Sequence, residues 1–259
     1  PWYTGTRPLM REGSGRPPSW MAELFFEAAV VPAAAMPGVP EVERPADPGF
    51  TRADLLGASA HGPEPPRTFA AYKVLMEELF NPMRERALAL MVREPVFGTA
   101  REVWRKGQGQ ANAAIVQGLV PFVVRALEQA YDFTSPAIDY KAAAGFLGLY
   151  DMRHHRIVVS PGLFDKPLKE FLDTLIHEEM HAFQAERILM LNVQRKGRVL
   201  SAPERAIAQY WRNEEPKYRS ALAAGSSMSP ETKARYRMIG QEYHSWTTAH
   251  YMATRLAGS

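Results

Sequence analysis

The chain has 259 residues, of which 46% are hydrophobic and 23% charged, a composition typical of a folded protein with a well-filled core. It contains no run of about 18 apolar residues, which argues against a membrane span, and its net charge of +3 comes from scattered basic residues that favour a solvated face over a nucleic-acid groove. The absence of cysteine excludes disulfide bonds and thiolate chemistry and indicates no particular redox compartment.

Proline marks the first boundary. Twelve of the 21 prolines lie in residues 1–66, and long helices are not expected there because proline removes a backbone donor and fixes φ. The first residues show neither a starting Met nor the charged-then-apolar pattern of a signal peptide, so the chain looks like a fragment of something longer or a processed product. We expect residues 1–66 to form an extended arm or linker with one short helix at Ser19–Val30, and residues 67–259 to form the folded domain.

Helical patterns dominate from Thr68 onward. The sequence predicts two helices at Phe69–Leu79 and Met83–Val92, separated at Asn81-Pro82 because proline breaks helices. Further helices are expected at Thr99–Trp104 with Thr99 as its cap, at Ala111–Tyr131 with a bend at Pro121, at Lys166–Leu191 with Asp165 as its cap, at Pro203–Ala224, and at Pro230–Leu256 with Ser229 as its cap.

Two short β-prone runs interrupt these helices. Phe146–Tyr150 and His155–Val159 are rich in aromatic and β-branched residues, and Asp151-Met152-Arg153 between them suits a turn. They predict a hairpin directly before the long helix Lys166–Leu191. The expected fold is therefore α+β, mainly α, with a small sheet or hairpin beside that helix.

The long predicted helix carries His177-Glu178-Glu179-Met180-His181, an H-E-x-x-H motif. Histidines at this spacing lie about 40° apart on one helical face, so both imidazoles can reach a single Zn²⁺. Glu178 follows the first ligand and points beside the metal, where it can act as general base on a water whose pKa the zinc lowers. The motif predicts a zinc hydrolase that cleaves amide bonds.

Other polar residues of this helix need separate interpretations. The histidines and Gln184 lie opposite the apolar stripe, and Gln184 is the kind of residue that tunes a metal ligand through a hydrogen bond. Glu179 falls within the stripe, where we expect a buried hydrogen bond. The stripe consists of Leu168, Phe171, Leu172 and Leu175.

A catalytic zinc site needs a third protein ligand. No histidine occurs between His181 and His244, so the three-histidine form of the motif is absent. The best candidate is Glu242, because the segment Gln241–Ser245 resembles the Asn-Glu-x-x-Ser segment of thermolysin-like gluzincins, whose glutamate is the third ligand. The competing candidates are Glu214, Glu215, His244 and His250.

Candidates for contacting the substrate are less specific. A tyrosine hydroxyl can stabilise an oxyanion, although tyrosine on a helix more often packs in the core. His154 and His155 lie in the predicted hairpin, where a surface pair is the default interpretation over substrate contact. The three tyrosines considered are Tyr218, Tyr236 and Tyr243.

Two segments, Asp165–Gln184 and Tyr236–Trp246, resemble the metallopeptidase domain at the C-terminus of some type VI secretion spike proteins of the VgrG kind. The resemblance implies a zincin-like fold in which an edge strand before the motif helix lines the cleft and pairs with an extended substrate. It also implies an antibacterial toxin tethered to a larger secretion spike, secreted into the periplasm of a target cell and matched by a cognate immunity protein.

Two alternatives remain open at this point. The first alternative to the metallopeptidase is a non-catalytic binding or adaptor module of a spike. The second is a zinc amidase or endopeptidase that acts on peptidoglycan rather than on protein. Structural zinc sites normally use four protein ligands and often cysteine. The lack of cysteine and the presence of Glu178 beside the ligands therefore favour catalysis.

Overall fold

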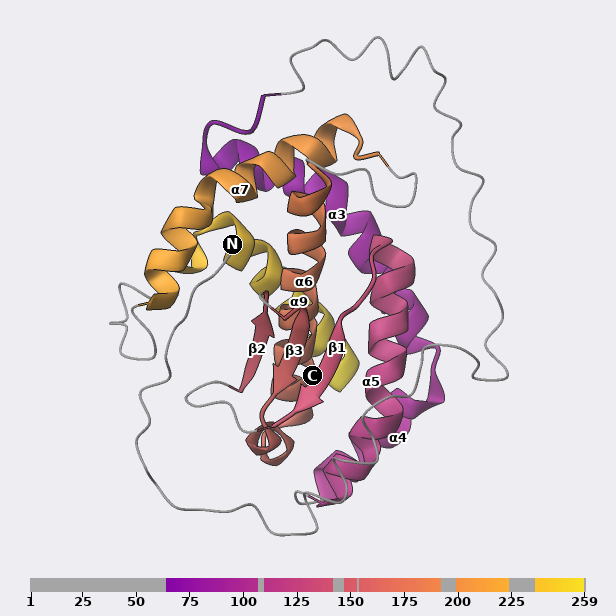
Figure 1. Cartoon of the computed structure of the whole chain (residues 1–259). Coiled ribbons are helices and arrows are strands. Elements are labelled where there is room, and N and C mark those ends of the chain that lie inside the picture. Colours follow the sequence, from indigo (N-terminus) through magenta and orange to yellow (C-terminus); the bar gives the residue numbers. More distant parts are fainter. Residues whose placement is uncertain are drawn as a thin grey trace.

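The computed structural model describes residues 64–106, 110–141, 147–152, 154–191, 199–223 and 236–258. The helix expected at Ser19–Val30 and almost all of the proline-rich arm lie outside these residues. The described part is mainly helical with one small three-stranded sheet, as the α+β expectation requires (Figure 1). Its elements are α3 (Phe69–Val92), α4 (Pro95–Lys106), α5 (Gln110–Tyr131), β1 (Ala137–Tyr140), β2 (Gly148–Asp151), β3 (Arg156–Val159), the 3₁₀ helix η1 (Pro161–Asp165), α6 (Leu168–Met190), α7 (Ala202–Ala223) and α9 (Gly240–Ala257).

Helix α3 corrects the expected break at Asn81-Pro82, because it runs without interruption through Pro82. A proline inside a helix costs about 3 kcal/mol through a lost hydrogen bond and a clash with the preceding turn. Tertiary burial offsets this cost, since side chains on both sides of Pro82 are buried in the core. They are Tyr72, Met76, Phe80, Ala87, Leu88 and Met91.

Two expected helix starts are also wrong, and one expected helix is interrupted. Helix α4 begins at Pro95, so Thr99 lies inside it rather than at its cap. Asp165 belongs to η1, and α6 begins only after Pro167. Ile239 has extended dihedral angles (φ −71°, ψ 132°), which interrupts the helix expected over Pro230–Leu256, and its expected cap lies outside the described residues.

Packing explains why α9 begins at Gly240. The Tyr72 hydroxyl donates a 2.6 Å hydrogen bond to the Gly240 carbonyl, and Glu214 accepts one of 3.0 Å from the Gly240 amide. A Cβ at this position would lie 2.7 Å from the Tyr210 ring. Side chains of α3 and α7 therefore set the first turn of α9, and sequence periodicity does not predict these contacts.

The sheet contains the expected hairpin and one strand that the sequence did not indicate. Strands β2 and β3 pair antiparallel, while β1 pairs parallel with β3, so that the order is β1-β3-β2. The missed β1 is only Ala-Ile-Asp-Tyr, too short for a clear alternating pattern. Strand β3 is central, and the edge strand next to α6 is β2.

Helix α6 lies at the centre of the described structure. It packs against α9 along most of its length and also contacts α7, α5 and the sheet (Figure 1). Its apolar stripe is buried as expected. No helix in the described ranges combines the length and apolar character needed to cross a bilayer.

Candidate metal centre

The two motif histidines project from successive turns of α6 toward the same point. Their Nε2 atoms are 3.0 Å apart, and the rings meet at 80° with centroids 4.6 Å apart. His181 is buried, whereas 22% of the His177 side chain is exposed. The pair therefore forms a polar site that reaches the protein surface on one side.

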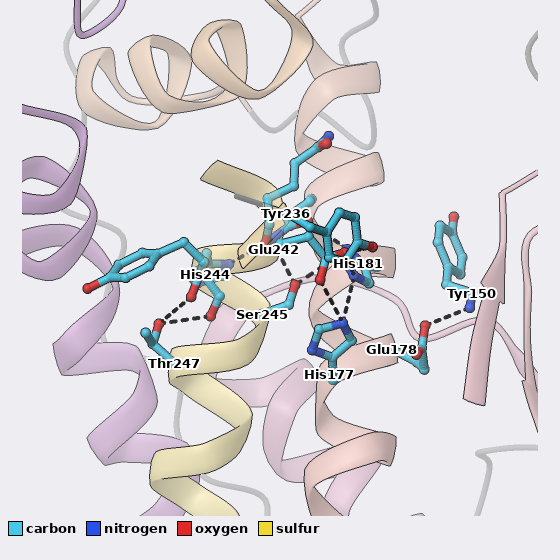
Figure 2. Close-up of polar contacts among 12 residues, drawn as sticks. Tyr150, His177, Glu178, His181, Tyr236, Glu242, His244, Ser245 and Thr247 are labelled. Atoms are coloured by element: carbon cyan, nitrogen blue, oxygen red, sulfur yellow. Dashed lines mark hydrogen bonds and ion pairs between the residues drawn. The ribbon is translucent and has the colours of Figure 1, made fainter. Parts of the chain in front are cut away.

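Glu242 reaches this point from α9, a helix far away in sequence (Figure 2). One carboxylate oxygen lies 3.5 Å from His177 Nε2 and the other 3.1 Å from His181 Nε2. The three side chains each offer a ligand atom, and these atoms lie within 4.8 Å of one another. Two imidazoles and a carboxylate form a donor set that suits Zn²⁺, so the residues present fit the expected metal.

The other candidates for a third ligand do not join this cluster within the described residues. Glu214 accepts hydrogen bonds from the Gly240 amide and from Lys217. His250 lies beside Lys169 and Asp173. Glu215 is buried in α7 outside the cluster, and His244 is buried with its Nδ1 toward Gln184. Glu242 is thus the expected third residue that the fold brings to the histidines.

Electrostatics prepares the cluster for a cation. Burial and the neighbouring His181 lower the pKa of His177 to about 4, which leaves its imidazole neutral and able to bind a metal. Burial alone would lower the pKa of His181 and raise that of Glu242. Their mutual attraction overcomes both effects, so that the pKa of His181 is raised and the pKa of Glu242 is lowered.

Glu178 lies beside the cluster and points to the sheet. Its Oε2 accepts a 2.7 Å hydrogen bond from the Tyr150 backbone amide on edge strand β2. Gly148 makes this close approach feasible, because a Cβ there would lie 2.5 Å from Thr174 Cγ2 and 3.1 Å from Glu178 Cγ. Burial raises the pKa of Glu178 to about 7, a value suited to a group that both takes and gives a proton near neutral pH.

Two of the three candidate tyrosines lie at the cluster. The Tyr236 hydroxyl donates a 2.5 Å hydrogen bond to Glu242, and its ring stacks on that of Tyr218. The Tyr218 ring centroid is 5.7 Å from that of His181. Tyr243 packs against Phe69 instead. Burial raises the pKa of Tyr236 far above its usual range, so its hydroxyl is a neutral donor.

Glu179 forms the buried hydrogen bond expected of it, but not in the metal cluster. It is fully buried, and its Oε1 accepts a 2.9 Å hydrogen bond from the Ser135 hydroxyl. Its other oxygen has no hydrogen-bond partner among the described residues. Burial raises the pKa of Glu179 to about 8, so the side chain is largely protonated at neutral pH.

The hairpin histidines stay outside the cluster. His154 Nδ1 is 2.7 Å from an Asp151 carboxylate oxygen, and His155 Nδ1 is 2.9 Å from the Tyr150 hydroxyl. Sequence reasoning missed the two sheet residues that matter for Glu178, Gly148 and Tyr150. Neither carries a sequence signal, because one acts by lacking a side chain and the other through its backbone amide.

No family model matches this chain, and neither do the curated proteins or solved structures with which it was compared. The chemistry of the site is therefore argued from its own geometry. That geometry unites two imidazoles, one carboxylate and an adjacent carboxyl group held by a strand.

Proposed function

We propose that the domain is a zinc-dependent metallopeptidase that cleaves amide bonds with water activated by Glu178. The observation that carries the proposal is the convergence of His177, His181 and Glu242 from two helices, with Glu178 held beside them. Three protein ligands next to a proton-transfer group are the arrangement of a catalytic zinc site, whereas structural sites use four ligands. This supports an enzyme over a non-catalytic module of a secretion spike.

Each residue has a distinct role in the proposal. His177, His181 and Glu242 hold the ion, which when bound supplies Lewis acidity to an amide carbonyl and to water. Glu178 accepts the proton from the attacking water and delivers it to the leaving amine. Burial raises the pKa of Glu178 before any cation is bound, and the Tyr150 amide keeps its carboxylate aimed beside the ligands.

Tyr236 is the donor that the geometry favours for the carbonyl oxygen. Its hydroxyl already lies at the cluster, where it donates to Glu242, and its raised pKa keeps it protonated. A neutral donor at this place can turn its one hydrogen from Glu242 to the carbonyl oxygen and stabilise the negative charge that develops there during attack. Tyr218 supports it by stacking on its ring.

The proposal includes a zincin-like fold. Supporting features are the motif helix α6, the sheet whose edge strand β2 contacts the general base, and the later helix α9 that brings the third ligand. The exposed part of His177 lies on the side from which a substrate can enter. In this arrangement an extended peptide would run along β2.

The biological setting rests on the resemblance to VgrG-type spike domains. We propose an antibacterial toxin delivered by type VI secretion that acts in the periplasm of the target cell, with a cognate immunity protein in the producer. The substrate is a protein or the peptide part of peptidoglycan. Both contain amide bonds, so a comparison of denatured casein with purified peptidoglycan separates the two.

The first experiment is elemental analysis of the wild type and two variants, each purified without added metal. We expect about one zinc per wild-type chain, almost none in His177→Ala, and a reduced content in Glu242→Ala, because each removes one ligand of three. His154→Ala is the matched control, since this histidine is exposed and bound to Asp151 outside the cluster. It should keep its zinc.

Two outcomes would contradict the proposal in different ways. A folded wild type that takes up no zinc even after dialysis against it would rule out the metallopeptidase. Full zinc content in Glu242→Ala would instead reject the third ligand.

A further inference from the structure

Gln184 is buried at the interface between α6 and α9, the two helices that supply the candidate ligands. It lies three residues after His181 on α6, and only 1% of its surface is exposed. Its Oε1 is 3.0 Å from His181 Nδ1, and its Nε2 faces α9. One amide therefore contacts both a metal-ligand candidate and the helix that carries another.

The orientation of this amide follows from its neighbours. The Gln241 backbone carbonyl lies 2.9 Å from Gln184 Nε2, and a carbonyl can only accept. The NH₂ group must therefore face α9, where Ser245 Oγ and His244 Nδ1 also lie 3.0 Å away. A flipped amide would set two carbonyl oxygens against each other. The oxygen of Gln184 consequently faces His181.

This orientation decides which ring nitrogen of His181 carries the hydrogen when a cation binds at Nε2. Without a cation, the Glu242 carboxylate 3.1 Å from Nε2 is a second acceptor that competes for this hydrogen. Gln184 Oε1 has no hydrogen to give, so His181 Nδ1 must be the donor of the 3.0 Å contact. The neutral imidazole then has its free lone pair on Nε2. Nε2 is the atom that faces His177 and Glu242 at 3.0 and 3.1 Å.

Ser245 does not duplicate this role. Its hydroxyl is 3.4 Å from His181 Nδ1, longer than the contact made by Gln184. A hydroxyl can also rotate to donate or accept, so it imposes no tautomer. The amide, held by the Gln241 carbonyl, has no such freedom.

We propose that Gln184 is the positioning residue of this site, holding His181 in the Nδ1–H tautomer and joining its ring to the α9 backbone next to Glu242. This inference rests on the proposed function for its metal, although Gln184 favours a hydrogen on Nδ1 in the metal-free protein too, where Glu242 favours one on Nε2. Outer hydrogen bonds of this kind orient metal-binding histidines, and their loss typically lowers metal affinity about 10- to 100-fold.

The first test needs neither metal nor substrate. Imidazole ¹⁵N chemical shifts of histidine-labelled, metal-free protein report which nitrogen of His181 is protonated, with the signal assigned by its loss in His181→Gln. Above the pKa of the ring, the fraction of His181 protonated on Nδ1 should be larger in the wild type than in Gln184→Met, because the variant loses the acceptor at Nδ1 and keeps Glu242 at Nε2. Equal fractions in the two proteins would overturn the proposal, whatever the metal content.

The second test compares two buried glutamines at the same helix interface. Gln184→Met removes the amide that contacts His181, while Gln241→Met removes a buried amide side chain that does not and keeps the Gln241 backbone carbonyl. We expect zinc affinity, measured by competition with a chelator, to fall about 10- to 100-fold in Gln184→Met. Gln241→Met should bind zinc like the wild type. Equal affinities in the two variants would overturn the proposal.

Failure of this inference is distinguishable from failure of the proposed function. A wild type without zinc defeats the metallopeptidase, and the role of Gln184 with it. A zinc-binding wild type whose His181 tautomer is the same in Gln184→Met defeats the Gln184 proposal alone. If Gln184→Met does not fold, Gln184→Asn, whose amide is withdrawn from His181 by one carbon, decides by the same measurements.

Discussion

Helix α6 contributes to the site through two sides that are built differently. On the α9 side, His177 and His181 meet Glu242 through side chains of two packed helices. On the sheet side, Glu178 is held by a backbone amide of β2, and Gly148 leaves room for it. Figure 2 shows the histidines and Glu178 pointing to these two sides, with Glu242 at one and Tyr150 at the other.

In the proposed enzyme, this difference separates the residues that hold the ion from the residue that moves the proton. Removal of a ligand on the α9 side should alter metal content, while a change on the sheet side should alter turnover and leave the metal in place. A helix pair can align several side chains at one point, whereas a strand edge offers a fixed backbone donor that no substitution except proline removes. Variants on each side can therefore test whether the two functions are separable.

The largest effect on turnover is expected from Glu178→Gln. The amide can still accept from the Tyr150 amide but cannot take a proton from water, so kcat should fall about 10²- to 10⁴-fold with zinc content unchanged. Steady-state kinetics and elemental analysis measure both quantities. The adjacent Glu179→Gln is the matched control and should keep its activity. Loss of zinc in Glu178→Gln would break the proposed separation.

Tyr236→Phe tests the α9 side without removing a ligand. The variant loses the hydroxyl proposed to stabilise the carbonyl oxygen, and kcat should fall about 10²- to 10³-fold. Tyr243→Phe is the control, because this ring packs against Phe69 away from the cluster. A similar kcat in the two variants would mean that Tyr236 only supports Glu242.

Gly148→Ala tests the contact between the strand and the general base. The new Cβ would lie 2.5 Å from Thr174 Cγ2 and 3.1 Å from Glu178 Cγ, so the strand or the base must move. Overpacking of this kind costs about 1–3 kcal/mol, measured by chemical denaturation, and kcat should fall while zinc remains.

A rescue makes this test specific. Thr174→Ser removes the methyl group in the shorter of the two contacts, so the double variant should regain part of the stability. Gly118→Ala is the control, because its nearest neighbour would be 3.8 Å away. No rescue in the double variant would show that the clash with Thr174 is not the cause.

The last expected effect concerns Glu179, and it develops gradually over several pH units. Its pKa is about 8 in the folded protein against about 4.5 as a free side chain, so the folded state binds more protons between these values. Stability from this group is therefore present at low pH and is lost as pH rises toward 8. Glu179→Gln removes the titration and should gain stability over the wild type by about 1.4 kcal/mol per pH unit at most.

Thermal unfolding of the metal-free proteins at several pH values measures this difference. Glu178 also has a raised pKa but is present in both proteins, so it cancels from the comparison. A difference between Glu179→Gln and the wild type that stays constant with pH would contradict the buried, protonated state of Glu179.

Much of the helical framework was predictable, and the errors share a cause. The ranges of α5, α6 and α7 follow the apolar periodicity closely. The break predicted at Pro82 is absent, because burial keeps α3 intact. The break observed at Ile239 was not predicted, because packing against α3 and α7 sets the start of α9. In both places contacts between distant segments outweighed a local signal.

The sequence by itself determined that His177 and His181 share one face of a helix, with Glu178 next to them, because a helix places residues four apart on one face whatever surrounds it. It also placed Glu242 first among the candidates for the third ligand, but without a distance to either histidine. The tertiary structure alone decided that Glu242 meets the histidines, that Gly148 and Tyr150 hold the base, and that the Gln184 oxygen faces His181. The physical reason is that these contacts join segments far apart in the chain, and their geometry is set by packing of α9 and β2 on α6 rather than by any local periodicity.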